Sequence, residues 1–115
     1  MAIFLILVSM KYVFWRFLFF VTALSVLFLA IAPVAAPLPT TGWDKSNHLI
    51  AFAVLAYLGQ KAFSKTNLKL LIGLTAFGGL IEVLQTFTPT RSGEWQDLLA
   101  DVLGIFAGLF FAKCF

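Results

Sequence analysis

The chain has 115 residues, of which 62% are hydrophobic and only 11% are charged. Soluble domains carry roughly 25% charged residues, and a soluble chain this short cannot bury so much apolar surface. The net charge is +3, but the basic residues form no stripe, so nucleic acid is not an expected partner. Cys114 is the only cysteine, which excludes an internal disulfide. We therefore predict a single membrane domain over residues 1–115.

The clearest predicted membrane span covers residues 17–36. It is uncharged, and about 20 apolar residues suffice to cross roughly 30 Å of hydrocarbon. Lys11 and Arg16 precede it, and prolines close it from Pro33 onward. A cleavable signal peptide is the alternative, because Ala30-Ile31-Ala32 resembles a cleavage site. We favour a retained span, because the rest of the chain is itself predicted to be a membrane protein.

The apolar residues 1–10 leave two alternatives open. They could add a segment that lies on the membrane surface. Translation could instead start at Met10, which would give the first span a conventional positive flank in Lys11.

Three further spans are predicted, at residues 46–60, 70–87 and 95–112. Asp44 fits the N-cap of the second span, and Lys113 follows the fourth. Short connections favour an up-and-down arrangement. The predicted fold class is therefore all-α, an integral membrane bundle of about four transmembrane helices.

The basic residues orient this bundle. One side carries six of them, which are Lys11, Arg16, Lys61, Lys65, Lys69 and Lys113. The other side carries only Lys45 and Arg91. Because cytoplasmic loops carry the excess of Lys and Arg, both termini are predicted to be cytoplasmic. The acidic residues then fall at the outer side, and they are Asp44, Glu82, Glu94, Asp97 and Asp101.

Polar side chains from three predicted helices lie at a similar depth below the outer membrane surface. A helix rises about 1.5 Å per residue, so His48 lies roughly 6 Å deep, Glu82 roughly 8 Å and Asp101 roughly 9 Å. Gln85 and Asp97 are shallower, and each shares a helical face with the deeper acid of its own span. Intramembrane carboxylates are costly and are functional hypotheses by default. We therefore predict a polar pocket that opens outward.

Gly104 and Gly108 lie on the same helical face as Asp97 and Asp101. Small residues at this spacing allow two membrane helices to approach closely. We expect this approach to press the acidic face of the fourth span against the third.

Three short motifs follow one another with a definite order and spacing. Residues 44–48 read Asp-Lys-Ser-Asn-His, and residues 78–85 read Gly-Gly-Leu-Ile-Glu-Val-Leu-Gln. Arg91 is followed by Asp97, by Asp101 and by the two glycines. This pattern, over most of the chain, resembles the DKxxH, GxxxExxQ and RxxxxxDxxxNxxG motifs of the VanZ-like family. One departure is Asp101, which stands where the family often has asparagine.

The resemblance implies a small multi-pass protein of the bacterial cytoplasmic (inner) membrane. The namesake of the family is linked to resistance to teicoplanin, a lipoglycopeptide that acts at the outer membrane face. The family has no settled biochemical activity. The expected ligands are therefore membrane lipid, a lipid-linked molecule and a glycopeptide. The chain is also expected to form an oligomer or to bind a partner membrane protein. The cofactor and any metal are left open.

As an enzyme acting on a lipid-linked or phosphate-bearing substrate of the cell envelope, the chain would use His48 and Glu82 as general acid and base, with Asp101 beside them. Lys45 and Arg91 would hold a phosphate. The full set of predicted substrate-binding residues is Asp44, Lys45, Gln85, Arg91 and Asp97. Asp97 and Asp101 could also bind a divalent cation. Two alternatives remain, a non-catalytic protein that binds or translocates lipid or antibiotic, and a small structural partner subunit.

Overall fold

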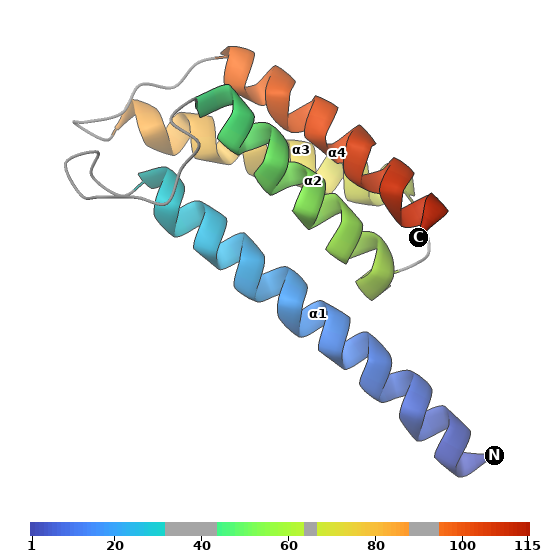
Figure 1. Ribbon diagram of the computed structural model, residues 1–115. Coiled ribbons are helices and arrows are strands. Elements are labelled where there is room, and N and C mark those ends of the chain that lie inside the picture. Colours follow the sequence, from blue (N-terminus) through green and yellow to red (C-terminus); the bar gives the residue numbers. More distant parts are fainter. Residues whose placement is uncertain (32–43, 64–66, 88–94) are drawn as a thin grey trace.

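The computed structural model describes residues 1–31, 44–63, 67–87 and 95–115, with the side chains of residues 44 and 45 left out. Within these residues the chain forms helices and no strand, as the all-α prediction expected. Figure 1 shows the four helices, which are α1 (Ala2–Ile31), α2 (Asp44–Phe63), α3 (Asn67–Thr86) and α4 (Trp95–Cys114).

The first helix departs most from its predicted bounds. α1 begins at Ala2 and ends at Ile31, so residues 1–10 continue the same helix and form no separate segment. The physical reason is that Ala2–Ile31 contains neither proline nor glycine to interrupt a helix. Residues 32–36, where the predicted span ended, lie outside the described part of the chain.

Two of the four helices are long and apolar enough to cross a membrane, in the part of the chain that the structure describes. They are α1, with a mean hydropathy of 2.2, and α3, with 1.5. α2 and α4 are as long as α3, but each carries several ionisable residues near its ends. Length and composition thus support two spans, where the sequence predicts four.

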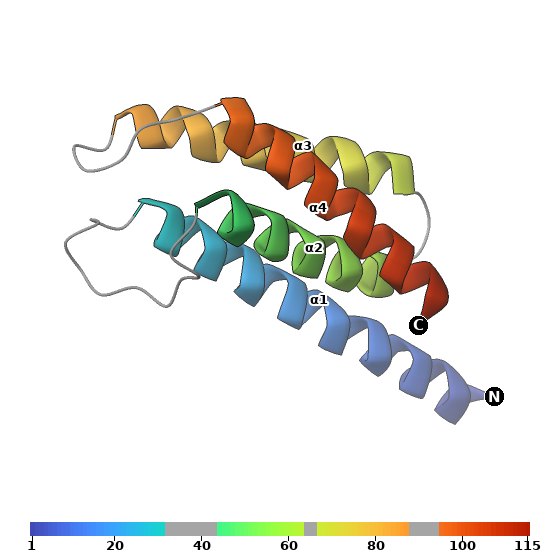
Figure 2. The same ribbon diagram turned by 45° about the horizontal axis from the view of Figure 1, so that its top comes forward.

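The helices form an up-and-down bundle around α2. Figures 1 and 2 show α4 along one side of α2 and α1 along another, with α3 lying across α4 and close to the end of α1. α2 and α4 share the most extensive contact, and α3 packs mainly on α4. The N-terminal part of α1 projects beyond the other helices (Figure 2). The C-terminus lies at the same end of the bundle as this projection.

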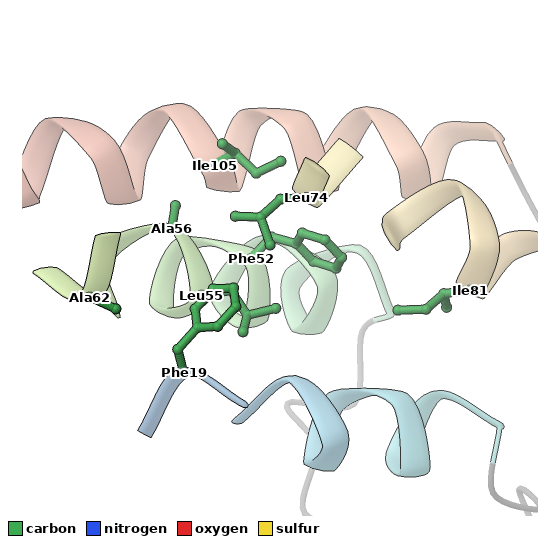
Figure 3. Packing of buried hydrophobic residues seen from close by; sticks show 8 residues of the cluster. All are labelled: Phe19, Phe52, Leu55, Ala56, Ala62, Leu74, Ile81 and Ile105. Atoms are coloured by element: carbon green, nitrogen blue, oxygen red, sulfur yellow. The ribbon is translucent and has the colours of Figure 1, made fainter. Parts of the chain in front are cut away.

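The apolar core is small and centred on α2. Figure 3 shows Phe52 of α2 beside Leu74 of α3 and Ile105 of α4, while Leu55 of α2 faces Phe19 of α1. Phe52, Leu55 and Ile105 are fully buried. Most of the remaining large apolar side chains on the four helices point outward.

Two glycines of α4 allow its backbone to contact the backbone of α2. A Cβ atom added at Gly104 would collide with the carbonyl oxygen of Leu49, and one added at Gly108 with the carbonyl oxygen of Ala53. The close approach expected of these glycines is therefore present, but its partner is α2. The expectation that they press α4 against α3 was wrong, because the glycine face of α4 is turned toward the helix that carries His48.

Gly108→Ala should destabilise the bundle by about 1–3 kcal/mol, because its added methyl group meets the backbone of Ala53, which cannot rotate away. The free energy of unfolding in detergent measures this cost. Gly73→Ala on α3 is the matched control, since a Cβ there has no neighbour within 4 Å. We expect the control to be neutral or stabilising by up to about 1 kcal/mol. Equal costs for both variants would contradict this account of the α2–α4 contact.

Candidate functional site

A histidine from α2 and three carboxylates from α3 and α4 meet at one end of the bundle. His48 lies about one turn after the start of α2, and Glu82 about one turn before the end of α3. Asp97 and Asp101 lie in the first two turns of α4. Because the helices alternate in direction, these positions fall at the same end. We call these four residues the His–carboxylate cluster.

The closest contact in the cluster joins His48 to Asp101. The Nδ1 atom of His48 lies 2.8 Å from Oδ1 of Asp101, a residue with 0% exposure. A carboxylate can only accept a hydrogen bond, so Nδ1–H of His48 donates to Oδ1 of an ionised Asp101. This bond fixes the orientation of the imidazole ring and, in a neutral ring, leaves the lone pair on Nε2.

The other two carboxylates lie on either side of the same ring. Oε1 of Glu82 is 3.9 Å from Nδ1 of His48, and Oδ2 of Asp97 is 3.8 Å from Nε2. Both distances are too long for hydrogen bonds but short enough for ion pairs with a protonated imidazole. The imidazole of His48 thus faces a carboxylate at each ring nitrogen, in a site that is largely shielded from solvent.

Gly78 of α3 makes the space that Asp101 occupies. A Cβ atom at Gly78 would lie 2.6 Å from Oδ2 of Asp101 and 3.3 Å from Cδ1 of Leu98. Oδ2 of Asp101 is itself buried and has no hydrogen-bond partner among the described residues. Gly78 belongs to the second sequence motif, but the motif alone predicts no role for it. The available signal was its position four residues before Glu82, on the same helical face.

Gln85 makes a hydrogen bond to α1 that its sequence pattern does not predict. Its Nε2 donates a hydrogen bond of 2.9 Å to the carbonyl oxygen of Ala30. This carbonyl belongs to the last turn of α1, whose carbonyl groups lack partners within the helix. Gln85 therefore ties the end of α3 to the end of α1, beside the cluster, and its role in binding substrate stays a prediction.

The remaining predicted site residues are not described in enough detail to place them. α2 begins at Asp44, but the side chains of Asp44 and Lys45 lie outside the described part of the structure. Arg91 lies in a segment that is outside it altogether. The N-cap role of Asp44 and the phosphate-binding roles of Lys45 and Arg91 therefore stay predictions.

Three members of the cluster could hold a metal ion. His48, Glu82 and Asp101 each offer one ligand atom, and these atoms lie within 4.8 Å of one another. The set combines one imidazole nitrogen with two carboxylate oxygens, which are common ligands of zinc and of other divalent transition metals.

Basic side chains gather at the opposite end of α2. Nε of Arg16 donates a hydrogen bond of 3.2 Å to the carbonyl oxygen of Ala62. The guanidinium of Arg16 lies 5.3 Å from the ring centroid of Phe63, and Nζ of Lys61 lies 5.4 Å from that of Tyr57. These contacts are typical of cation–π interactions. The bundle thus has an acidic end around His48 and a basic end around Arg16.

Comparison of the chain with models of known protein families, with curated proteins and with solved structures gives no match. The resemblance to the VanZ-like family therefore stays a prediction from the motifs.

Gly78→Ala should lower the free energy of unfolding by about 1–3 kcal/mol, because its methyl group meets the carboxylate of Asp101. In an Asp101→Ala background the same substitution should cost much less, because the contacting oxygen is gone. A double-mutant cycle measures this coupling. Gly79→Ala, where a Cβ has no neighbour within 4 Å, is the matched control. Absence of coupling between positions 78 and 101 would contradict the site geometry.

Proposed function

We propose that the chain is a multi-pass protein of the bacterial cytoplasmic membrane, with all four helices crossing the bilayer. Each helix carries outward-facing apolar side chains, for example Phe28 on α1, Val54 on α2, Ile72 on α3 and Phe110 on α4. Soluble monomers rarely expose such extensive apolar surface. α2, α3 and α4 have 20 residues each, which gives a length of about 30 Å, close to the thickness of the hydrocarbon layer.

The separation of charge along the bundle supports an orientation with both termini in the cytoplasm. Arg16, Lys61, Lys69 and Lys113 lie toward the basic end, where α2 and α4 finish and α3 begins. The positive-inside rule places this end at the cytoplasmic surface. The His–carboxylate cluster then lies just below the outer surface, where a lipid head group can reach it.

Thiol labelling tests this orientation, because Cys114 is the only cysteine and is exposed. A membrane-impermeant maleimide should label Cys114 only after the membrane of the expression host is permeabilised. In the matched Cys114→Ser/Gln96→Cys variant, which moves the thiol to the exposed start of α4, labelling should proceed in intact cells. The opposite pattern would place the cluster in the cytoplasm and would contradict the proposal.

The cluster supports chemistry on the polar part of a lipid-linked or phosphate-bearing substrate of the cell envelope. The observation that carries this proposal is the bond of 2.8 Å between His48 and the fully buried Asp101. Asp101 holds the ring so that Nε2 can take a proton from a water molecule or a substrate hydroxyl group. The carboxylates of Asp101 and Asp97 stabilise the imidazolium that forms.

In this mechanism Glu82 supplies the second proton-transfer group. Its carboxyl lies on the Nδ1 side of the ring, and in its protonated form it would donate to the leaving group as general acid. Lys45, three residues before His48, and Arg91, six residues before Asp97, are the expected phosphate ligands. The polar head group would react at the outer end of the bundle while its lipid chain stays in the bilayer.

Non-catalytic binding of a lipid head group or of a glycopeptide is the second candidate function. The observation that favours it over translocation lies in the interior of the bundle below the cluster. Among the described residues, Phe52, Leu55 and Ile105 are fully buried there. They are apolar, so this part of the interior disfavours a polar route toward the basic end. A small structural partner subunit is the third candidate, in which the cluster serves only to hold the helices together.

Lipid analysis separates these functions. At matched membrane abundance, Glu82→Gln and His48→Gln should abolish the conversion of a membrane lipid species that wild type converts, because each removes a proton-transfer group. Mass spectrometry of total lipid and of lipid that co-purifies with the protein measures this, with Gly79→Ala as control. If no species is converted and wild type alone retains one, the protein is a binding protein. If the variants accumulate to lower levels than wild type before abundance is matched, and behave like wild type once it is matched, the cluster is structural.

A further inference from the structure

We propose that the His–carboxylate cluster binds one divalent transition-metal ion, of the zinc class, through Nδ1 of His48 and one carboxylate oxygen each from Glu82 and Asp101. The proposal concerns the same site and rests on the proposed function for its substrate. With the ion bound, His48 and Glu82 would act as ligands, so the proton transfers proposed for them above belong to the metal-free site, and a metal-bound water molecule would take their place. Metal binding itself follows from the arrangement of these three side chains.

The distances between the ligand atoms are close to those of a metal site. In a tetrahedral zinc site the ligand atoms lie about 2.0–2.2 Å from the metal and therefore about 3.3 Å from one another. In the structure Nδ1 of His48 is 2.8 Å from Oδ1 of Asp101 and 3.9 Å from Oε1 of Glu82. These two distances lie on either side of the required value. The ligand oxygens of Glu82 and Asp101 lie within 4.8 Å of each other. Side-chain shifts of up to about 1.5 Å would therefore bring all three atoms to a common ion.

The type and number of ligands agree with this metal class. Imidazole nitrogen and carboxylate oxygen are established zinc ligands, and the same donors also suit other divalent transition metals. Three protein ligands leave a fourth position open, which is the arrangement of catalytic sites. The open position would take a water molecule or a phosphate oxygen of the substrate. His48, Glu82 and Asp101 come from three different helices, so the packed bundle holds their relative positions.

The surroundings of the three ligands supply a second, independent observation. Oδ2 of Asp101 is buried and has no hydrogen-bond partner among the described residues. A buried carboxylate that is paired through only one of its two oxygens costs free energy, which a cation bound at that paired oxygen, Oδ1, would offset in part by its charge.

Asp97 lies beside the ring nitrogen of His48 that would not bind the metal. Its Oδ2 atom is 3.8 Å from this nitrogen, Nε2. Histidine ligands of metals usually donate their second N–H group to a carboxylate, a carbonyl group or water.

Metal binding and the His48–Asp101 hydrogen bond exclude each other, because the metal replaces the proton on Nδ1. The metal-free site is therefore the hydrogen-bonded pair seen in the structure, and the metal-bound site places the ion between the same two atoms. Since the imidazole must lose this proton, metal affinity should fall as the pH is lowered. Binding of Mg²⁺ or Ca²⁺ through carboxylates would show a much weaker dependence on His48.

Metal titration of the purified full-length protein in detergent tests the proposal. Cys114→Ser serves as the background, because it removes the one exposed thiolate ligand. After treatment with EDTA, we expect one equivalent of Zn²⁺ per chain and, with Co²⁺, the visible absorption of a four-coordinate site. His48→Gln, Glu82→Gln and Asp101→Asn should each weaken the affinity by at least about tenfold. Asn67→Asp, which adds a carboxylate at the opposite end of the bundle, should leave it unchanged.

The variants are checked for folding by helical circular dichroism. As a second measurement, Zn²⁺ should raise the thermal midpoint of the background protein and of Asn67→Asp, but not that of His48→Gln. Absence of a stoichiometric ion in the folded background protein would overturn the proposal. Unchanged affinity in folded His48→Gln and Glu82→Gln would also overturn it.

The two proposals fail in different ways. If the EDTA-treated protein binds no Zn²⁺ but still converts or retains a lipid, the metal inference fails and the proposed function stands. If one equivalent of Zn²⁺ binds through His48 and no lipid is converted or retained, the metal site stands and the proposed function fails.

Discussion

The hydrogen bond between His48 and Asp101 is the interaction on which the rest of the structure depends. It joins α2 to α4 at a distance of 2.8 Å, with the carboxylate completely removed from solvent. This requires a close approach of the two helices, which Gly104 and Gly108 provide, and an open space on α3, which Gly78 provides. The small residues of the bundle thus serve the polar site as much as they serve the packing. A bulkier side chain at Gly78 would displace the acid that orients the histidine.

The polar groups are concentrated at one end, and this asymmetry limits what the protein can do. Three carboxylates and one imidazole at the acidic end can hold or exchange protons with a head group. In the part of the chain that the structure describes, the interior beyond them contains the fully buried apolar side chains of Phe52, Leu55 and Ile105, which disfavour passage of a polar substrate. If the four helices cross the bilayer as proposed, this arrangement favours chemistry or binding at the membrane surface over transport. The same arrangement makes a metal ion a consistent occupant, because the buried acids need positive charge nearby.

Much of this site could be predicted from the sequence, because helical rise and period are fixed. They placed His48, Glu82 and Asp101 at one level, and the structure brings these side chains together. The last three helices also agree with their predicted spans to within a few residues. Helix partners could not be predicted, because the glycine spacing shows that α4 can approach a neighbour but not which one. The role of Gly78 and the contact of Gln85 with Ala30 likewise depend on residues that are distant in the chain.

The most direct test of the His48–Asp101 pair is nitrogen NMR of the histidine ring in lipid bilayers. The chain has a single histidine, so a ¹⁵N label on the imidazole reports on this site alone. In metal-free protein at neutral pH we expect Nδ1 to carry a hydrogen-bonded proton, and this signal to change in Asp101→Asn. Lys69→Gln, at the far end of α3, should leave it unchanged. A spectrum typical of a freely hydrated imidazole, identical in wild type and Asp101→Asn, would contradict the central claim.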